Sequence, residues 1–197
     1  MEDTLVIDIE TKKLLRDIGH SGIEMPKLGI SVVGVYSYVQ DKFMAFREEE
    51  FDELEKLLSQ AGQIVGFNLF GFDYPVMCGH LDFDFARVKT VDILDDIRQA
   101  VGHRLSLNSV AKTTLGVQKS ADGLQAVRFY QEGRWEELEK YCLDDVRITR
   151  DLFNFGRRHK FIKVAANYGL GTKNVLVNWS LMDGVFSSVS GSQKSLL

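Results

Sequence analysis

Hydrophobic residues along this chain occur in two kinds of pattern, one typical of strands and one typical of helices. Continuous β-branched or apolar runs predict strands, and apolar residues three or four positions apart predict amphipathic helices. The predicted strands cover residues 4–10, 28–39, 42–46, 63–67 and 88–91. The predicted helices cover residues 48–59, 73–80, 92–101, 107–115, 124–132 and 134–159. This order favours an α/β fold with a mixed sheet, an antiparallel hairpin plus parallel strands, flanked by helices.

The connections between these elements carry turn and capping signals. Residues 11–27 are polar and contain glycine and proline, which predicts a loop. The helix at 107–115 is expected to begin after a Ser106 or Asn108 cap and to end at Gly116. The helix at 73–80 is expected to open at Asp73, with Pro75 in its first turn.

After the longest predicted helix, the sequence predicts a short hairpin and then a segment without regular secondary structure. Residues 161–165 and 175–179 predict a closing hairpin around residues 168–171. Residues 180–197 are rich in Ser and Gly, which is typical of a loosely ordered or contact-making tail. We therefore expect a single domain over residues 1–179, followed by a flexible tail.

Composition and charge limit the classes of function that fit this chain. A chain of 197 residues with 45% hydrophobic and 26% charged residues suits one well-buried globular domain. The net charge of −4 argues against a protein that coats nucleic acid. It does not argue against a nuclease, because a carboxylate cluster stays negative until metal fills it. The sequence has no GxGxxG motif and no P-loop, which disfavours a nucleotide cofactor.

Cysteines and the N-terminus indicate the compartment. Cys78 and Cys142 lie far apart in apolar surroundings, so we expect buried free thiols in a reducing compartment. The acidic N-terminus enters a strand directly and does not resemble a signal peptide. No apolar run reaches the length of a membrane span, so a membrane partner is not expected. The expected location is the cytoplasm.

Carboxylates recur at the ends of predicted elements. Asp8 and Glu10 are two positions apart, so both side chains leave the same face of a strand. Tyr141 and Asp145 are four positions apart, so they share one face of a helix. Together with Asp73, these groups would form a cage of oxygen ligands for hard divalent cations. Such a cage suits two-metal hydrolysis of a phosphodiester.

With these residues placed, the chain resembles the DEDD superfamily of 3′–5′ exonucleases, which have a ribonuclease H-like fold. The resemblance is to the tyrosine subgroup, found in the proofreading domains of family B DNA polymerases and in stand-alone relatives. Its motifs match Asp8-Ile9-Glu10, Asn68 with Phe72-Asp73, and Tyr141 with Asp145. The segment LNSVAKTTLG, residues 107–116, is also similar. The resemblance covers about residues 4–160.

The resemblance implies a role for each motif residue. Asp8 would bridge two Mg²⁺ or Mn²⁺ ions, and Glu10 and Asp145 would complete the site for the ion that activates water. Asp73 would hold the second ion, partly through water. Tyr141 would orient the attacking water. The reaction would remove nucleoside 5′-monophosphates from the 3′ end of single-stranded nucleic acid, with DNA favoured over RNA.

Substrate contacts are expected beside the first two motifs. Thr11, Lys12 and Lys13 follow the first motif. Lys12 and Lys13 would lie beside the 3′ terminus and contact the sugar-phosphate backbone and not the bases. Asn68 is either an amide that pins its loop or a substrate contact. The sequence leaves open whether the protein acts alone or beside a helicase or polymerase, and in which oligomeric state.

Each site residue also has a plain structural interpretation. Singly, Asp8 and Glu10 are ordinary polar residues at a strand end, and Asp73 is a helix cap. Tyr141 alone is a core aromatic, and Asp144 is an alternative ligand within helical reach of it. At the level of function, the alternatives are an RNA-processing exoribonuclease, a structure-specific endonuclease and a non-catalytic nucleic-acid-binding module.

For several residues near the motifs, a structural role is the favoured interpretation and a substrate contact is the alternative. Asp92 and Asp95 are expected to cap or solvate a helix. Arg104 is expected in a surface loop, with phosphate contact as the alternative. Three aromatic residues are expected in the core or at its rim, with stacking on a base as the alternative for one of them. They are Phe70, Phe72 and Tyr74.

Overall fold

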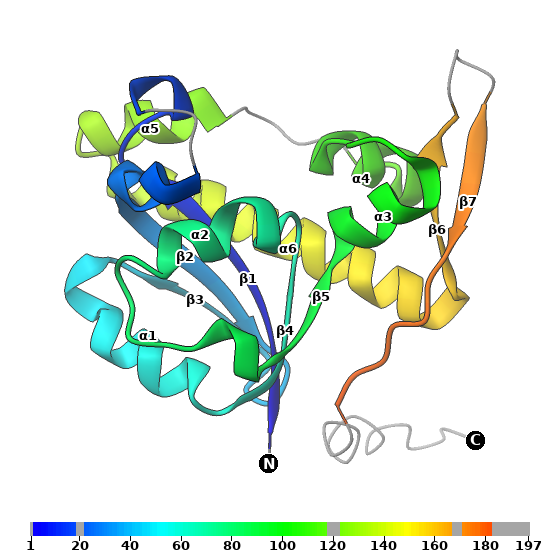
Figure 1. Ribbon diagram of the computed structural model, residues 1–197, viewed down its shortest axis with the longest axis horizontal. Helices are drawn as coiled ribbons and strands as arrows, with labels where there is room; N and C mark the ends of the chain where they lie inside the picture. The colour runs from blue at the N-terminus through cyan, green and yellow to red at the C-terminus, as the bar shows by residue number, and fades with distance from the viewer. Residues whose placement is uncertain (1, 19–21, 118–122, 167–170, 183–197) are drawn as a thin grey trace, which may run out of the picture.

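The protein is described by a computed structural model, which covers residues 2–18, 22–117, 123–166 and 171–182 (Figure 1). Its centre is a five-stranded sheet in the order β3-β2-β1-β4-β5. The strands are β1 (Asp3–Thr11), β2 (Ile30–Ser37), β3 (Lys42–Phe46), β4 (Ala61–Gly66) and β5 (Lys89–Asp92). Strands β1, β2 and β3 pair antiparallel, whereas β4 and β5 run parallel to β1. The mixed sheet predicted from the sequence is therefore confirmed.

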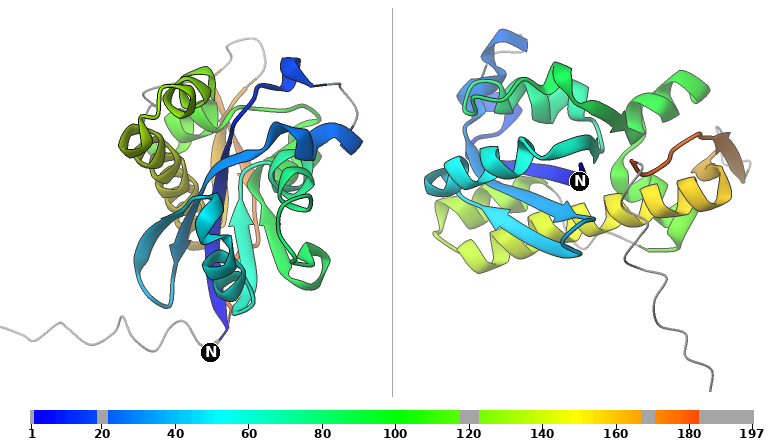
Figure 2. Two further views of the ribbon diagram at one scale, coloured as in Figure 1. Left: turned by 90° about the vertical axis from the view of Figure 1, so that its left-hand side faces the viewer. Right: turned by 90° about the horizontal axis from the view of Figure 1, so that it is seen from below.

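Helices cover both faces of this sheet. They are α1 (Phe51–Leu58), α2 (Tyr74–Met77), α3 (Ile93–Val101), α4 (Leu107–Leu115), α5 (Gly123–Gln131) and α6 (Trp135–His159). Figure 2 shows the sheet nearly edge-on, with α1 and α2 on one side and α5 and α6 on the other. The helix at 107–115 has the predicted bounds, with Ser106 as its cap and Gly116 in the left-handed conformation at its end.

The central strand β1 divides the hydrophobic core into two layers. Leu5, Ile7 and Ile9 pack in the layer that contains α1 and α2. Val6 packs in the opposite layer, which contains residues of α6. Because side chains alternate along a strand, the even-numbered residues of β1 all face α6. Asp8 and Glu10 continue this even-numbered row to the end of the strand.

Two predicted connections differ from the structure. The segment at 11–27 was expected to be a loop, but it contains short 3-10 helices over Leu15–Asp17 and Gly22–Leu28. The helix expected to open at Asp73 begins earlier, as a π-helical turn over Leu69–Asp73 that continues into α2. The reason is Asn68, whose φ of 76° reverses the chain directly after β4 and starts the turn there.

The closing hairpin forms with a different second strand. Strand β6 (Phe161–Ala165) has the predicted bounds, but its partner β7 covers Thr172–Leu176 instead of residues 175–179. The alternating apolar residues after β7 do not extend the hairpin, because they are buried against the core. They are Val177, Trp179 and Leu181. The remainder of the predicted tail, residues 183–197, lies outside the described residues.

The two thiols have different environments. Cys142 is buried, as predicted, whereas Cys78 is exposed, so its predicted burial is wrong. Cys78 directly follows the short helix α2, at its C-terminal cap. Both cysteines are free. In the described part of the chain, no helix combines the length and apolar character needed to cross a membrane.

Candidate active site

Helix α6 packs closely on the sheet at the level of Asp8. In the register of β1 and β2, Asp8 lies opposite Gly34. A Cβ atom at Gly34 would lie 2.8 Å from Cys142 Sγ and 2.9 Å from Val146 Cγ2. The Cys142 thiol also donates to the carbonyl oxygen of Asp8 over 3.5 Å. The absence of a side chain at Gly34 therefore permits the close approach that brings α6 to the acidic end of β1.

The buried stripe of α6 includes two of the predicted site residues. Tyr141 and Asp145 lie on it with the apolar residues that hold the helix against the sheet. Asp144 lies outside this stripe and forms an ion pair with Arg147. Of the two adjacent acids, Asp145 therefore lies on the face of α6 that packs on the sheet, and Asp144 does not.

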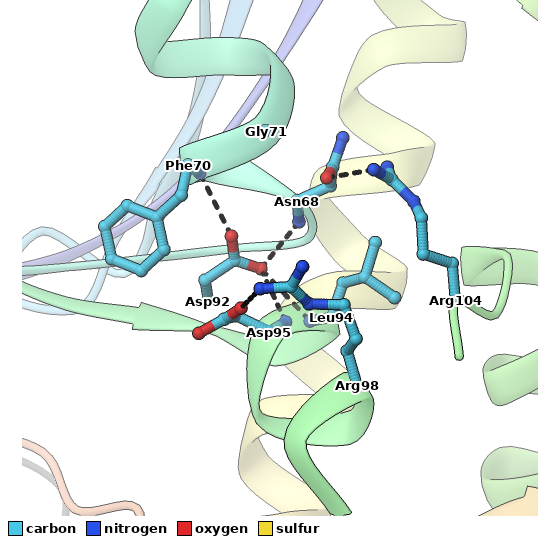
Figure 3. Close-up of a pocket in the computed structure, with 8 residues that line it drawn as sticks. All are labelled: Asn68, Phe70, Gly71, Asp92, Leu94, Asp95, Arg98 and Arg104. Atoms are coloured by element: carbon cyan, nitrogen blue, oxygen red, sulfur yellow. Dashed lines mark hydrogen bonds and ion pairs between the residues drawn. The ribbon is translucent and has the colours of Figure 1, made fainter. Parts of the chain in front are cut away.

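The turn after β4 is fixed by a carboxylate from β5 (Figure 3). The backbone N–H groups of Asn68 and Phe70 donate to the two oxygens of Asp92, over 2.8 and 3.0 Å. Asp92 also accepts from the N–H groups of Leu94 and Asp95, so it caps α3 as predicted. The cap was foreseen from the sequence, but the link to Asn68 was missed, because nothing in the local pattern connects residues 24 positions apart.

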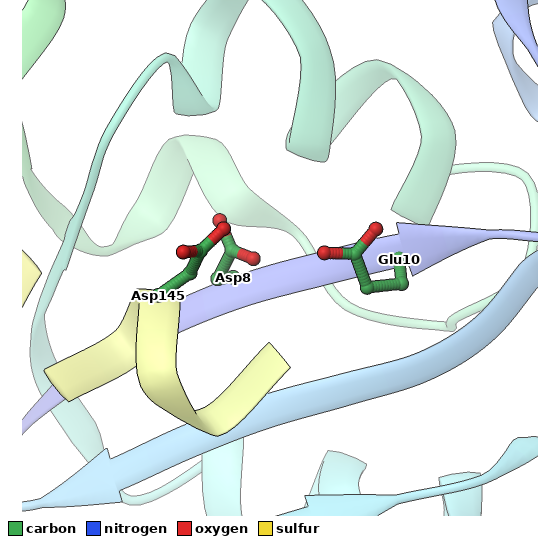
Figure 4. Close-up of side chains that lie close together, drawn as sticks. All are labelled: Asp8, Glu10 and Asp145. Atoms are coloured by element: carbon green, nitrogen blue, oxygen red, sulfur yellow. The ribbon is translucent and has the colours of Figure 1, made fainter. Parts of the chain in front are cut away.

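Three of the predicted metal ligands lie together. The nearest carboxylate oxygens of Asp8, Glu10 and Asp145 are all within 4.8 Å of one another (Figure 4). Asp145 is only 4% exposed and Glu10 9% exposed. Three carboxylates this close repel one another unless protons or a cation neutralise them. The donor set is entirely oxygen, which fits a hard divalent cation such as Mg²⁺ or Mn²⁺.

A cavity of about 270 Å³ lies beside this acidic cluster. It is bounded by the end of β1, the turn over residues 67–73 and α6. Six of the predicted site residues line it: Asp8, Glu10, Thr11, Asn68, Asp73 and Tyr141. Asp73 therefore faces the same space as Asp8 and Glu10, although it does not belong to the group within 4.8 Å. The cavity brings a strand, a turn and a helix to one point, as the motif spacing predicted.

Asp73 is buried, and no ion pair to a Lys or Arg is found for it in the described part of the chain. Its exposed fraction is 3%. The pKa of Asp73 is raised to about 7, mainly by burial and also by the nearby charge of Asp92, while backbone hydrogen bonds at Asp73 and Ile9 oppose the rise. Its position at the end of a π-helical turn, and not at a helix start, excludes the simple capping interpretation, since its side chain accepts no capping hydrogen bond.

The raised pKa of Asp73 makes a stability prediction for the metal-free protein. A group whose pKa is higher in the folded state stabilises the fold fully below its unfolded pKa of about 4 and loses that contribution as pH rises through its folded pKa near 7. We therefore expect Asp73→Asn to have a higher Tm than the wild type at pH 8 in EDTA. Each kcal/mol gained should raise the Tm by about 2–4 °C.

The pH dependence separates this effect from a change in packing. Asn has nearly the shape of a protonated Asp, so the difference in Tm between the two proteins should shrink towards pH 4. Thermal melts at half-unit pH intervals would measure it. A difference that stays constant from pH 4 to pH 8 would show that the Asp73 charge is not the cause.

Lys12 does not line the cavity. Its ammonium group pairs with Glu48 and lies 5.8 Å from the centroid of the Tyr130 ring, and the Glu48 hydrogen bond raises the pKa of Lys12. Its aliphatic carbons pack on Gly29. The next residue, Lys13, lines the cavity instead. A substrate contact of Lys12 stays a prediction, and Lys13 is the lysine placed beside the acids.

Tyr141 is a packed core residue that also borders the cavity. Its ring packs in a hydrophobic cluster with Ala126, Phe129 and Leu138, and the residue is buried. Tyr141 also lines the cavity, one helical turn before Asp145. A packed ring holds its hydroxyl group in one place, which is the property that a positioning residue requires.

Comparison with known proteins identifies a family and solved structures of similar fold. The sequence profile of the RNase H superfamily matches residues 5–155, from β1 into α6. No curated protein sequence matches the chain. A solved structure of the family B DNA polymerase from the hyperthermophilic archaeon Pyrobaculum calidifontis is similar, with a TM-score of 0.59 and 16% identity over 79% of this chain. The chain spans only 24% of that polymerase, so the likeness concerns the fold of one part.

Proposed function

The chain belongs to the RNase H superfamily and has a ribonuclease H-like fold, and we propose that it is a metal-dependent 3′–5′ exonuclease of single-stranded nucleic acid, with DNA as the favoured substrate. The observation that carries this proposal is the placement of Asp8, Glu10 and Asp145 within 4.8 Å of one another, next to a cavity. Asp8 and Glu10 line this cavity together with Asp73 and Tyr141. Members of the tyrosine subgroup of 3′–5′ exonucleases, which the motifs resemble, combine these residue types.

The carboxylates have the chemistry to hold two divalent ions. Asp8, Glu10 and Asp145 would hold the first, and Asp8 and Asp73 would share the second. When bound, such ions supply an activated water and positive charge for the scissile phosphate. The carboxylates in turn need the ions, because their mutual repulsion in a buried site is otherwise relieved only by protonation.

Other residues of the cavity are suited to holding the substrate. Lys13 supplies a positive charge and Thr11 a hydroxyl group near the acids. Contacts of this kind to phosphate fix the position of a strand without reading its sequence. Tyr141 would donate or accept a hydrogen bond that orients the attacking water. Because elements from three directions surround one phosphate, a terminus must be unpaired to enter, which favours single strands over blunt duplexes.

The direct test uses a 5′-labelled DNA oligonucleotide, a matching RNA and a covalently closed single-stranded DNA circle. With Mg²⁺ or Mn²⁺ we expect a ladder that shortens from the 3′ end, release of nucleoside 5′-monophosphates, and faster degradation of DNA than of RNA. Excess EDTA should abolish the reaction, because the ligand set depends on a hard cation. The circle should persist, because it has no end.

Each alternative function predicts another result in the same assay. Cleavage of the circle would indicate an endonuclease, and degradation of RNA alone would indicate an exoribonuclease. Retention of the labelled strand without any metal-dependent cleavage would indicate a binding module. Activity that persists in EDTA would contradict the proposed site altogether.

A further inference from the structure

A second cavity adjoins the acidic one on the other side of Asn68 (Figure 3). It has a volume of about 270 Å³, and Asn68 lines both cavities. The remaining lining includes one aromatic residue, two arginines and two acids. They are Phe70, Arg98, Arg104, Asp92 and Asp95. None of these residues has a role in the site described above except Asp92, which fixes the turn.

Phe70 presents an aromatic ring to solvent at this cavity. It is 54% exposed, and among the large hydrophobic residues exposed in the described part of the chain it is the single aromatic one. Its backbone is fixed by Asp92, and its ring makes an edge contact with Tyr74, with centroids 5.9 Å apart. An exposed ring on a fixed backbone is the usual platform on which single-stranded nucleic acid stacks a base.

Among the charged side chains of this cavity, the Arg104 guanidinium group is the one available to bind a phosphate. Asp92 accepts four backbone N–H groups, and Asp95 accepts from Arg98 and Gln99. Arg104, in contrast, has no carboxylate partner among residues 2–18, 22–117, 123–166 and 171–182. Its guanidinium group donates a hydrogen bond of 2.8 Å from Nη2 to Asn68 Oδ1. A guanidinium group carries five N–H donors, so most of its donors stay available for a phosphate.

Asn68 lies between the two cavities and is held in a fixed conformation. Its left-handed backbone is fixed through Asp92, and its side-chain oxygen accepts from Arg104. The Asn68 oxygen also needs the space over Gly71, where a Cβ atom would lie 2.5 Å away. A strand that extended from the acidic cavity into the second cavity would therefore pass Asn68.

We propose that the second cavity is a subsite for the nucleotide next to the 3′-terminal one. Phe70 stacks on the base of that nucleotide, and Arg104 binds a phosphate on its 5′ side. This subsite rests on the proposed exonuclease function, because it takes its position along the strand from the acidic site. It would hold the strand in register after each terminal nucleotide leaves.

Binding measurements without turnover test the subsite. The probe is a 5′-fluorescein DNA oligonucleotide, either intact or with an abasic second nucleotide from the 3′ end, in Ca²⁺. For the wild type, we expect loss of that base to raise the Kd about tenfold, the usual effect of one stacked base. For Phe70→Ala, the same loss should raise the Kd less than twofold, because the stacking partner is gone. Leu176→Ala, which removes an 84% exposed side chain on β7, is the control and should respond like the wild type.

Arg104→Gln tests the phosphate contact. It should raise the Kd for both oligonucleotides about equally and should lower the salt dependence of log Kd by about 0.7, the value for one phosphate on a single strand. The control is Arg87→Gln, because Arg87 is exposed and pairs with Asp84 away from both cavities. An unchanged salt dependence would overturn the role of Arg104.

The outcome for the subsite is distinct from that for the proposed function. An equal penalty for the abasic nucleotide in the wild type and in Phe70→Ala, or no penalty in the wild type, would overturn the subsite even if the wild type degrades DNA in Mn²⁺. Failure of that degradation would overturn the exonuclease function, whereas the base-specific coupling to Phe70 would still identify a nucleotide site.

Discussion

Replacing Asp8 or Asp145 with Asn should reduce metal-dependent hydrolysis by about a thousandfold or more. Asn retains the size of Asp but removes one of the three charges that lie within 4.8 Å of one another. Charge stabilisation by a bound metal amounts to several kcal/mol in the transition state, and each factor of ten in rate corresponds to about 1.4 kcal/mol. Single-turnover rates on a single-stranded oligonucleotide, measured at saturating Mn²⁺, would provide the test.

The matched control is Asp144→Asn. Asp144 is adjacent to Asp145 and carries the same charge, but it faces away and pairs with Arg147. Its replacement should change the rate less than threefold. Near-wild-type hydrolysis by Asp8→Asn would place the active site elsewhere in the molecule.

Stability measurements separate loss of catalysis from loss of folding. In EDTA, Asp8→Asn and Asp145→Asn should melt at or above the wild-type Tm, because removal of one charge relieves repulsion among the three. A fall in Tm with the loss of activity would point to a structural role for these carboxylates.

The two pairs of motif residues were predictable because their geometry is local. The period of two along β1 places Asp8 and Glu10 on one face whatever the rest of the chain does. The turn of α6 likewise places Tyr141 and Asp145 together. The sheet order could be inferred only in part, because pairing partners are set by packing between distant segments.

What the sequence did not reveal depends on contacts between distant residues. Gly34 permits the approach of α6, but a glycine in a strand does not show which helix it admits. The hydrogen bond from the Asn68 N–H group to Asp92 fixes the turn after β4, and the helix begins at Leu69 and not at the predicted Asp73. Lys12 pairs with Glu48, 36 positions away, so of the two lysines expected beside the site only Lys13 lines the cavity. None of these contacts produces a periodic pattern of residues in the sequence from which it could be predicted.

Replacing Tyr141 with Phe should lower kcat by two to three decades and change KM little. The Phe ring would keep the packing with Ala126, Phe129 and Leu138, so the change removes only the hydroxyl group at the cavity. Loss of one preorganised hydrogen bond in the transition state typically costs about 2.7–4 kcal/mol. A loss confined to kcat is the signature of an interaction made in the transition state and not in substrate binding.

Two further measurements decide whether Tyr141 positions the reacting water or is only a core aromatic. The Mn²⁺ concentration for half-maximal rate should not change in Tyr141→Phe, because the hydroxyl group is not one of the clustered ligands. Tyr38→Phe is the control, since Tyr38 donates to Asn154 over 2.9 Å and does not line the acidic cavity, so its loss should affect Tm more than kcat. A core role alone predicts that Tyr141→Phe is nearly silent in rate. If it is silent and Asp144→Asn is inactive, then α6 presents a different face to β1, and the third motif has been assigned in the wrong register.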